Sequence, residues 1–462
     1  MFLFSSSCHN HTGDFLSSLR NITLHQTPIQ VEKLTWFRFG QLGDHVILTT
    51  DTGDWHLLEP DAFSDFIAGE LPEDSEDYAG LLAKGFVRNG FDVELQGGLI
   101  RRTKSFLYAG VHHHRVHLST PTGALPVEQA KAIVDHIFTS QSDSLTIAMI
   151  QGPKPVDPNV ISFVQEFAEE KNKYERRNIL YQLHGSLDGL DESTIGMLAK
   201  KRIQLHPHFD GSATVHDAQR NAHGGTSHEH AQARLLQVHA ATEDADTVAH
   251  VHVGRAAQGQ AAAIVAGLAE AHILGFRVTP ILEGDHAITP QAYGEFIVAI
   301  LGCLASQEEG TPRLREVQVD SLKARIWSGA ITEPLMCTPP STGYNARSYD
   351  PDGNVFPSCS ALQLHALGDS TFLIGNVAND SQEEIGNHPT LRTLMVATVK
   401  DCLPGYHQLW STPYIGVDPI AAYRSSGNIF TTTTNSVQHQ ATQAMLEAVF
   451  LHVIEELGSA EE

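Results

Sequence analysis

Short hydrophobic runs alternate with longer amphipathic stretches through the middle of the chain. The runs are rich in Val, Ile and Leu and are bounded by Gly, Pro or polar residues, which is typical of buried strands. Six strands are predicted, in HRVHLST, LTIAMIQG, RNILYQLHG, IQLHPHFDG, TVAHVHVG and FRVTPILEG. Strands that alternate with helices form parallel sheets, so this α/β pattern predicts a partial (β/α)6 TIM-type barrel.

The flanking segments have different patterns. An alternating ribbon with turns at Gly43 and Gly53, followed by short helices, fits a small winged-helix-like module. A later stretch is rich in Gly, Pro, Ser and Asn, which indicates an irregular domain. The predicted parts are an N-terminal tail (1–28), the winged-helix-like module (29–105), the barrel (106–333), the irregular domain (334–435) and a C-terminal helix (436–462).

Composition narrows the classes of partner. The 462-residue chain carries a formal net charge of −24, and an acidic surface repels nucleic-acid phosphate and anionic lipid. Its five scattered cysteines do not form a secreted disulfide framework. No apolar stretch approaches the ~20 residues of a membrane span. We therefore expect a soluble cytoplasmic protein without nucleic-acid or membrane partners.

Histidine is the unusual residue, with 27 copies against 30 for Lys and Arg together. Side chains alternate between the two faces of a strand, so His206, His208 and Asp210 share one face. His250 and His252 share a face of the next predicted strand in the same way. Two neighbouring strands thus each present a pair of imidazoles.

The order and spacing of several segments resemble the radical SAM proteins that carry a C-terminal SPASM domain, closest to the maturases of His-Xaa-Ser peptide systems. IQGPKP stands where that family has a Gly-Gly-Glu-Pro turn, and HFDG stands at its Ser-Leu-Asp-Gly strand end. YDPDGNVFPSCSALQLHALGDSTFLIGNV is SPASM-like. The resemblance implies a radical-SAM-like barrel, a SPASM-like domain over 334–435 and an N-terminal module that recognises a precursor peptide.

The departures from the family fall on its chemistry. The family's CxxxCxxC cluster motif follows the first barrel strand, where this chain reads HRVHLSTPTGALPVEQA without cysteine. Lys154 replaces the acid expected to meet the SAM amine, and Cys337, Cys359 and Cys402 are scattered. A 4Fe–4S cluster needs thiolate ligands. We therefore expect neither an iron–sulfur cluster nor SAM.

The inward histidines predict a transition-metal site, of iron or zinc. The family's strand-end aspartate points into the barrel, which implies that Asp210 and the alternating histidines also face inward, and imidazole is a common ligand of both metals. The predicted ligands are His184, His206, His208, Asp210, His250 and His252, with His117 as a further candidate. The alternative is that these are core histidines with satisfied hydrogen bonds, although each unpaired imidazole would cost ~1–3 kcal/mol.

Three other charged residues are candidates for binding substrate or an anion. Glu283 and Asp285 follow the sixth strand at the predicted barrel mouth, and Lys154 ends the second. Lys154 could equally be a solvated surface charge.

Two functions remain open, and no catalytic residue is assigned. The first is a cluster-free, radical-SAM-like enzyme of ribosomal peptide maturation, a metal-dependent oxidoreductase or hydrolase. The second is a non-catalytic pseudoenzyme that binds the precursor peptide and scaffolds an active radical SAM maturase.

Overall fold

The structure is a computed structural model that divides into two compact units. The first contains Met1–Thr103, Arg325–Ala330 and His407–Tyr414, and the second contains the remainder. The described residues are 29–103, 110–154, 157–187, 190, 192–201, 203–220, 226–241, 247–307, 313–329 and 342–461. The predicted tail (1–28) and Cys337 lie outside them. No described helix combines the length and apolar character needed to cross a membrane.

The first unit is a three-stranded antiparallel sheet packed against short helices. Its turns at Gly43 and Gly53 have φ angles of 58° and 88°, which favour glycine, so the predicted ribbon is confirmed. The elements are β1 (Arg38–Leu42), β2 (His45–Thr49), β3 (Trp55–Leu58), α2 (Pro60–Ala68), α3 (Glu76–Ala83), η2 (Arg88–Gly90) and α4 (Val93–Thr103). Leu48, Phe63 and Phe86 are fully buried in its core.

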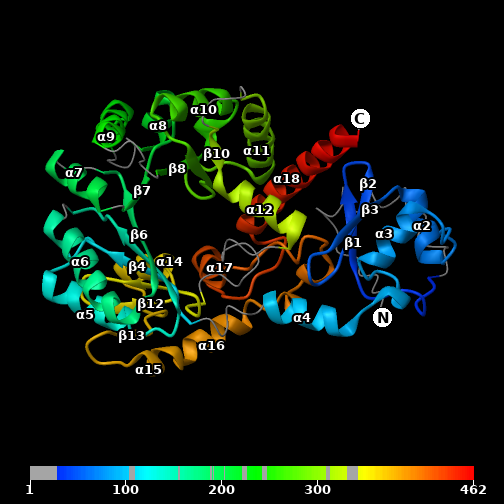
Figure 1. Cartoon of the computed structure of the whole chain (residues 1–462), viewed down its shortest axis with the longest axis horizontal. Coiled ribbons are helices and arrows are strands. Elements are labelled where there is room, and N and C mark those ends of the chain that lie inside the picture. The colour runs from blue at the N-terminus through cyan, green and yellow to red at the C-terminus, as the bar shows by residue number, and fades with distance from the viewer. Residues whose placement is uncertain are drawn as a thin grey trace. The chain divides into compact units, whose positions relative to one another are not determined.

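The second unit alternates strands and helices over its first half. All six predicted strands are present, and Figure 1 shows their helices around the sheet. The elements are β4 (His113–His117), α5 (Val127–Ile137), β5 (Ser144–Ile150), α6 (Pro158–Glu175), β6 (Asn178–Gly185), α7 (Glu192–Lys200), β7 (Gln204–Pro207), α8 (Ala213–Arg220), α9 (His228–Ala241), β8 (Val248–Val253), η5 (Arg255–Ala257), α10 (Ala261–Glu270), β9 (Gly275–Pro280), α11 (Pro290–Ala305), β10 (Arg315–Glu316) and α12 (Val317–Ser328).

The second half of this unit is less regular. Its elements are β11 (Ala346–Tyr349), β12 (Asn354–Phe356), α14 (Cys359–Ala366), β13 (Gly375–Asn376), α15 (Gln382–Gly386), α16 (Pro389–Val396), η6 (Lys400–Cys402), α17 (Pro419–Ser426) and α18 (Val437–Glu461). The short helix η7 (Tyr406–Gln408) begins in this unit and ends in the first. The strand expected in NVFPSCSAL ends at Phe356, because Ser358 caps a helix that begins at Cys359.

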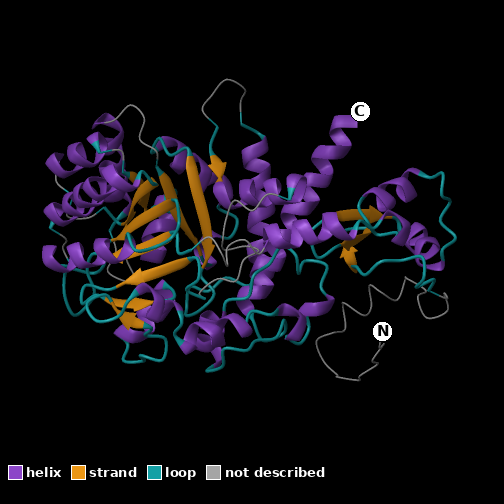
Figure 2. Ribbon diagram, turned by 60° about the horizontal axis from the view of Figure 1, so that its bottom comes forward, coloured by secondary structure: helices purple, strands orange, loops and turns teal. Residues whose placement is uncertain are grey.

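The sheet of the second unit is mostly parallel, as Figure 2 shows. One part has the strand order β13-β12-β11-β4-β5-β6-β7, and the other has the order β10-β9-β8. Two isolated parallel bridges, Leu205 to Thr247 and His208 to His250, join β7 to β8. The described strands do not close into a barrel. The joint between β7 and β8 is the weakest lateral connection along the row from β4 to β9.

Alternation fixes which side chains face the interior of this curved sheet. Along β8, Ala249, Val251 and Val253 are fully buried, whereas His250 and His252 are less buried and point to the opposite face. On β4, His114 is fully buried and contacts Tyr349. His113 and His117 therefore lie on the other face of β4.

Gly211 provides a stability test beside the β7–β8 joint. Its φ is 70°, and an added Cβ would lie 2.3 Å from the carbonyl oxygen of Ile264 in α10. Gly259 has a φ of 68° but no atom within 4 Å of such a Cβ. Gly259→Ala should therefore cost only the backbone penalty of about 1–2 kcal/mol, and Gly211→Ala should cost clearly more. Urea unfolding of both variants measures the difference, and equal losses would contradict it.

Candidate metal centre

Three histidines from three adjacent parallel strands meet at the interior of the second unit. His184, His206 and His250 come from β6, β7 and β8, and one ligand nitrogen of each lies within 4.8 Å of the others. The rings of His184 and His206 stack with centroids 4.2 Å apart. The ring of His250 lies 5.3 Å from that of His184. Within the described residues, no other group of three or more His, Cys, Asp or Glu side chains is this close.

Two glutamines orient the first two imidazoles. The Oε1 atom of Gln182 lies 3.2 Å from Nε2 of His184, and Oε1 of Gln204 lies 2.8 Å from Nε2 of His206. Because an amide oxygen only accepts, each Nε2 must carry the proton, which leaves each Nδ1 with a lone pair. Nε2 of Gln182 also donates to Oε1 of Gln204 at 2.7 Å and links the two pairs. This is the outer-shell arrangement that metal-binding histidines use.

The free lone pair of His206 is the feature that core packing does not explain. Its Nδ1 atom is buried and has no hydrogen-bond partner. Buried polar atoms in proteins are almost always paired, and leaving one unpaired costs about 1–3 kcal/mol. A cation shared with His184 and His250 would satisfy it.

All three imidazoles are held in the neutral form that binds metals. Burial, aided by the nearby charges of His206 and His250, lowers the pKa of His184 far below its usual value. Burial and Arg277 lower the pKa of His206 to about 3. Burial and its histidine neighbours also hold the pKa of His250 well below 6.5. Protons therefore do not compete for these nitrogens near neutral pH.

The structure places His208 and His252 next to the triad but outside it. The ring of His208 lies 6.1 Å from that of His250 and 5.9 Å from that of His252. Burial and Arg220 lower the pKa of both, to about 3 for His208 and about 4 for His252. His208 and His252 therefore continue the row of neutral imidazoles along β7 and β8 beyond the triad.

Asp210 is not brought to the triad. Its carboxylate accepts hydrogen bonds from Nε and Nη2 of Arg220 at 2.9 and 2.7 Å, and from the backbone N–H of His252 at 2.8 Å. Burial raises the pKa of Asp210, but Arg220 and the His252 amide outweigh it and lower the pKa overall. A carboxylate engaged in this way stabilises the strand end. Alternation grouped Asp210 with His206 and His208, and the family resemblance implied that it faces inward. Neither indicated Arg220, which lies ten residues later on α8.

The other predicted residues lie apart from the triad. His117 ends β4 and interacts with Cys359 of α14. Lys154 and Asp285 are exposed, and Glu283 forms an ion pair with Arg424 at 3.0 Å. The pattern in VHHHRVH did contain a signal for inward His113 and Arg115, because both alternate with buried residues, and both act electrostatically on His184.

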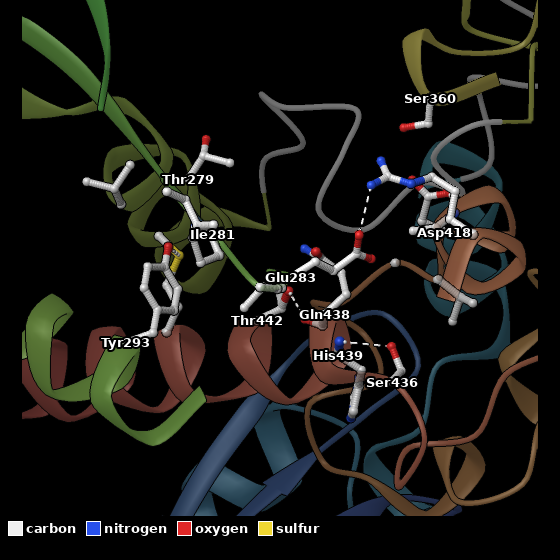
Figure 3. A pocket seen from close by; sticks show the side chains of 18 of the residues that line it. Thr279, Ile281, Glu283, Tyr293, Ser360, Asp418, Ser436, Gln438, His439 and Thr442 are labelled. Atoms are coloured by element: carbon white, nitrogen blue, oxygen red, sulfur yellow. Dashed lines mark hydrogen bonds and ion pairs between the residues drawn. The ribbon is translucent and has the colours of Figure 1, made fainter. Parts of the chain in front are cut away.

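A cavity of about 740 Å³ lies beside the histidine row. His252 and Arg277 form part of its wall, and Arg277 is the register partner of His250. Figure 3 shows Thr279 and Tyr293 on one side, Ser360 and Asp418 on another, and Glu283 between them. Its mixed polar and apolar lining and its volume are those of a small-molecule or peptide-segment site.

Two solved structures with TM-scores above 0.5 share this architecture. No family model and no curated protein matches the chain. The structure titled native anSMEcpe with bound AdoMet matches with a TM-score of 0.61 and 11% identity, covering 75% of this chain and 100% of that one. Its complex with AdoMet and the Cp18Cys peptide matches with a TM-score of 0.61 and 13% identity, covering 75% of this chain and 99% of that one. SuiB from Streptococcus suis, bound to its precursor peptide SuiA, gives a TM-score of 0.47 and 9% identity, covering 87% of this chain and 98% of that one. The chain has a radical SAM/SPASM-like fold.

The residues present do not fit the iron–sulfur cluster of that fold. The loop after β4 contains no cysteine. The described cysteines, Cys303, Cys359 and Cys402, lie on α11, α14 and η6 and do not form a cluster site. Imidazoles, in contrast, are gathered at the ends of β6 and β7 and on β8.

Replacing Asp210 tests its structural role. Asp210→Asn leaves the Arg220 charge without its partner in a buried setting, so the free energy of unfolding should fall by about 3–5 kcal/mol. The exposed Asp285→Asn is the control and should change it by less than about 0.5 kcal/mol. Urea unfolding at neutral pH measures both, and equal stability of the two variants would refute the role.

Proposed function

We propose that this protein is a cluster-free, radical-SAM-like metalloprotein in which His184, His206 and His250 hold a transition metal inside a partial (β/α)6 barrel. The observation that carries the proposal is the buried, unpaired Nδ1 of His206, oriented by Gln204 toward two further imidazoles. The proposed metal occupies the interior of a fold whose comparison structure binds AdoMet.

The ligand set favours zinc over iron. The described triad contains three imidazoles and no carboxylate, whereas ferrous oxygenase sites combine two histidines with a carboxylate. Three histidines with an open fourth position are typical of catalytic zinc, which supplies an activated water or polarises a carbonyl. We therefore propose zinc first and a hydrolytic reaction before an oxidative one.

We propose a peptide as the substrate class. Two observations support it: the cavity beside His252 and Arg277 can take a peptide segment, and a comparison structure of this fold contains a bound peptide. In this proposal residues 29–105 recognise the precursor, and residues 334–435 cover the barrel as a degenerate SPASM-like domain. The charged wall residue Glu283, paired with Arg424, would contact the bound segment.

Metal binding is tested on full-length protein made without a histidine tag. Chelator-treated protein should take up one Zn²⁺ per chain in calorimetric titration, and Co²⁺ should give the visible spectrum of a tetrahedral site. His206→Ala should weaken zinc binding by more than a hundredfold, since it removes a ligand. His230→Ala, an exposed histidine on α9, should leave the affinity unchanged.

Failure of this test has a definite meaning. Zinc binding below one equivalent, or equal affinity in the His206→Ala and His230→Ala variants, would overturn the metal proposal. The protein would then be a non-catalytic pseudoenzyme that binds precursor peptide beside an active radical SAM maturase.

The orienting glutamines give a second prediction. Gln204→Leu keeps the side-chain volume but removes the acceptor for Nε2 of His206. Losing such an outer-shell partner typically weakens metal affinity by 10–100-fold. The same titration measures this loss, while Gln237→Leu, at a surface position on α9, serves as the control. An unchanged affinity would show that Gln204 does not position a ligand.

A further inference from the structure

The face of the sheet that carries the histidine triad is positively charged, although the protein as a whole has a formal net charge of −24. The strand register from β4 to β9 places Arg115 and Arg277 on this face. They are the only Asp, Glu, Lys or Arg side chains among the described strand residues of that face. Asp210, beyond the end of β7, is already paired with Arg220. The interior therefore favours a negatively charged ligand.

Arg277 brings this positive charge to the wall of the cavity. It is half-buried and lines the cavity together with His252 and Thr279. His252 and Thr279 are register partners two positions beyond the pair of His250 and Arg277, so all four side chains lie on one face. A guanidinium has five N–H donors in a planar fork, and a carboxylate accepts two of them side by side. The wall thus offers donors that match a carboxylate.

The acidic side chains of the cavity are engaged with other groups. Glu283 forms its ion pair with Arg424 at 3.0 Å, drawn as a dashed line in Figure 3. The Oδ1 atom of Asp418 accepts the amides of Ile420 and Ala421 at 2.9 and 3.0 Å, at the N-terminus of α17. Among the described lining residues there is no further acid. The negative charge that complements the arginine wall must therefore come largely from a ligand.

Glu316, on the edge strand β10, offsets the charge of Arg277 only in part. Its two carboxyl oxygens accept the backbone amides of Val278 and Val319. Burial raises the pKa of Glu316 to about 7, although these amides and the charge of Arg277 act in the opposite direction. The carboxyl group is therefore partly protonated at neutral pH.

The metal proposed above would increase the positive charge. A divalent ion bound by three neutral imidazoles keeps its full charge, and His250 is the register partner of Arg277. Charges removed from water are costly unless an opposite charge compensates them. An anionic group on the ligand would compensate both the metal and the guanidinium.

We propose that the cavity binds a peptide segment that bears a carboxylate, and that this carboxylate pairs with the guanidinium of Arg277 beside the hydroxyl of Thr279. The proposal rests on the peptide substrate class proposed above and specifies its charge. An Asp or Glu side chain and a C-terminus supply the same carboxylate chemistry. Arg277 is then a specificity-determining residue, which selects the peptide and takes no part in breaking a bond.

Binding of short peptides to chelator-treated, full-length protein tests the proposal. The probes are acetyl-Ala-Glu-Ala-amide, acetyl-Ala-Gln-Ala-amide and acetyl-Ala-Ala-Ala with a free C-terminal carboxylate. Saturation-transfer NMR gives the Kd of each at about 0.15 M salt, which screens distant surface charges. A carboxylate probe should bind at least about tenfold more tightly than the Gln probe, because charge-assisted hydrogen bonds are about twice as strong as neutral ones. The probe that does so identifies the source of the carboxylate.

Two variants assign this preference to one side chain. Arg277→Gln should bring the ratio of the two affinities to about one, since an amide cannot form the charged pair. Arg315→Gln is the matched control, because Arg315 lies on the neighbouring strand β10, is exposed and pairs with Asp320 at 3.6 Å. It should leave the ratio unchanged. Circular dichroism and thermal unfolding establish that both variants are folded.

The other outcomes separate this site from the earlier proposals. Equal affinity for all three probes, or a folded Arg277→Gln protein that keeps the preference, would overturn the carboxylate site and leave peptide binding standing. Failure of every probe to bind would overturn the peptide substrate class and this site with it. A preference that depends on Arg277 in a protein that binds no zinc would support this site and remove only the metal.

Discussion

The position of the histidine triad depends on how β7 is held to β8. These strands are joined by two isolated bridges rather than a continuous ladder, yet His206 and His250 come one from each. Arg220 and Asp210 reinforce the joint: Arg220 binds the Asp210 carboxylate and the His250 carbonyl, and Asp210 accepts the amide of His252. One buried ion pair thus ties together the two strands that carry two of the three imidazoles. The carboxylate that resembles a metal ligand in the sequence instead stabilises the backbone that positions the ligands.

Local pattern predicted much of this arrangement. Alternation along IQLHPHFDG and TVAHVHVG correctly placed each pair of imidazoles on one face, and the family resemblance predicted the radical SAM/SPASM-like fold and an inward Asp210. Strand periodicity defines a face but not a depth. Periodicity therefore could not distinguish His206 from His208, which lies two residues later on the same face. Only His206 belongs to the triad. That distinction arises from the stagger of β7 against β8, which only the assembled sheet defines.

The contact partners of individual polar side chains could not be predicted from the sequence. Gln182 and Gln204 look like ordinary strand residues, but each lies two positions before a histidine on the same face and orients its imidazole. His114 and Tyr349 are separated by more than two hundred residues and meet because β11 pairs with β4. Such contacts depend on which strands become neighbours, and this information is distributed over the whole chain.

The row of neutral imidazoles also makes the free energy of unfolding depend on pH. In the unfolded chain these histidines bind protons near pH 6.5, whereas burial lowers the pKa of His206 and His208 to about 3 and that of His252 to about 4. Their contribution to stability is complete above pH 6.5 and declines as pH falls toward the folded-state values. Because all three groups lose this contribution over the same pH range, mild acid lowers the free energy of unfolding. The interior that gathers imidazoles therefore makes the native state sensitive to mild acid.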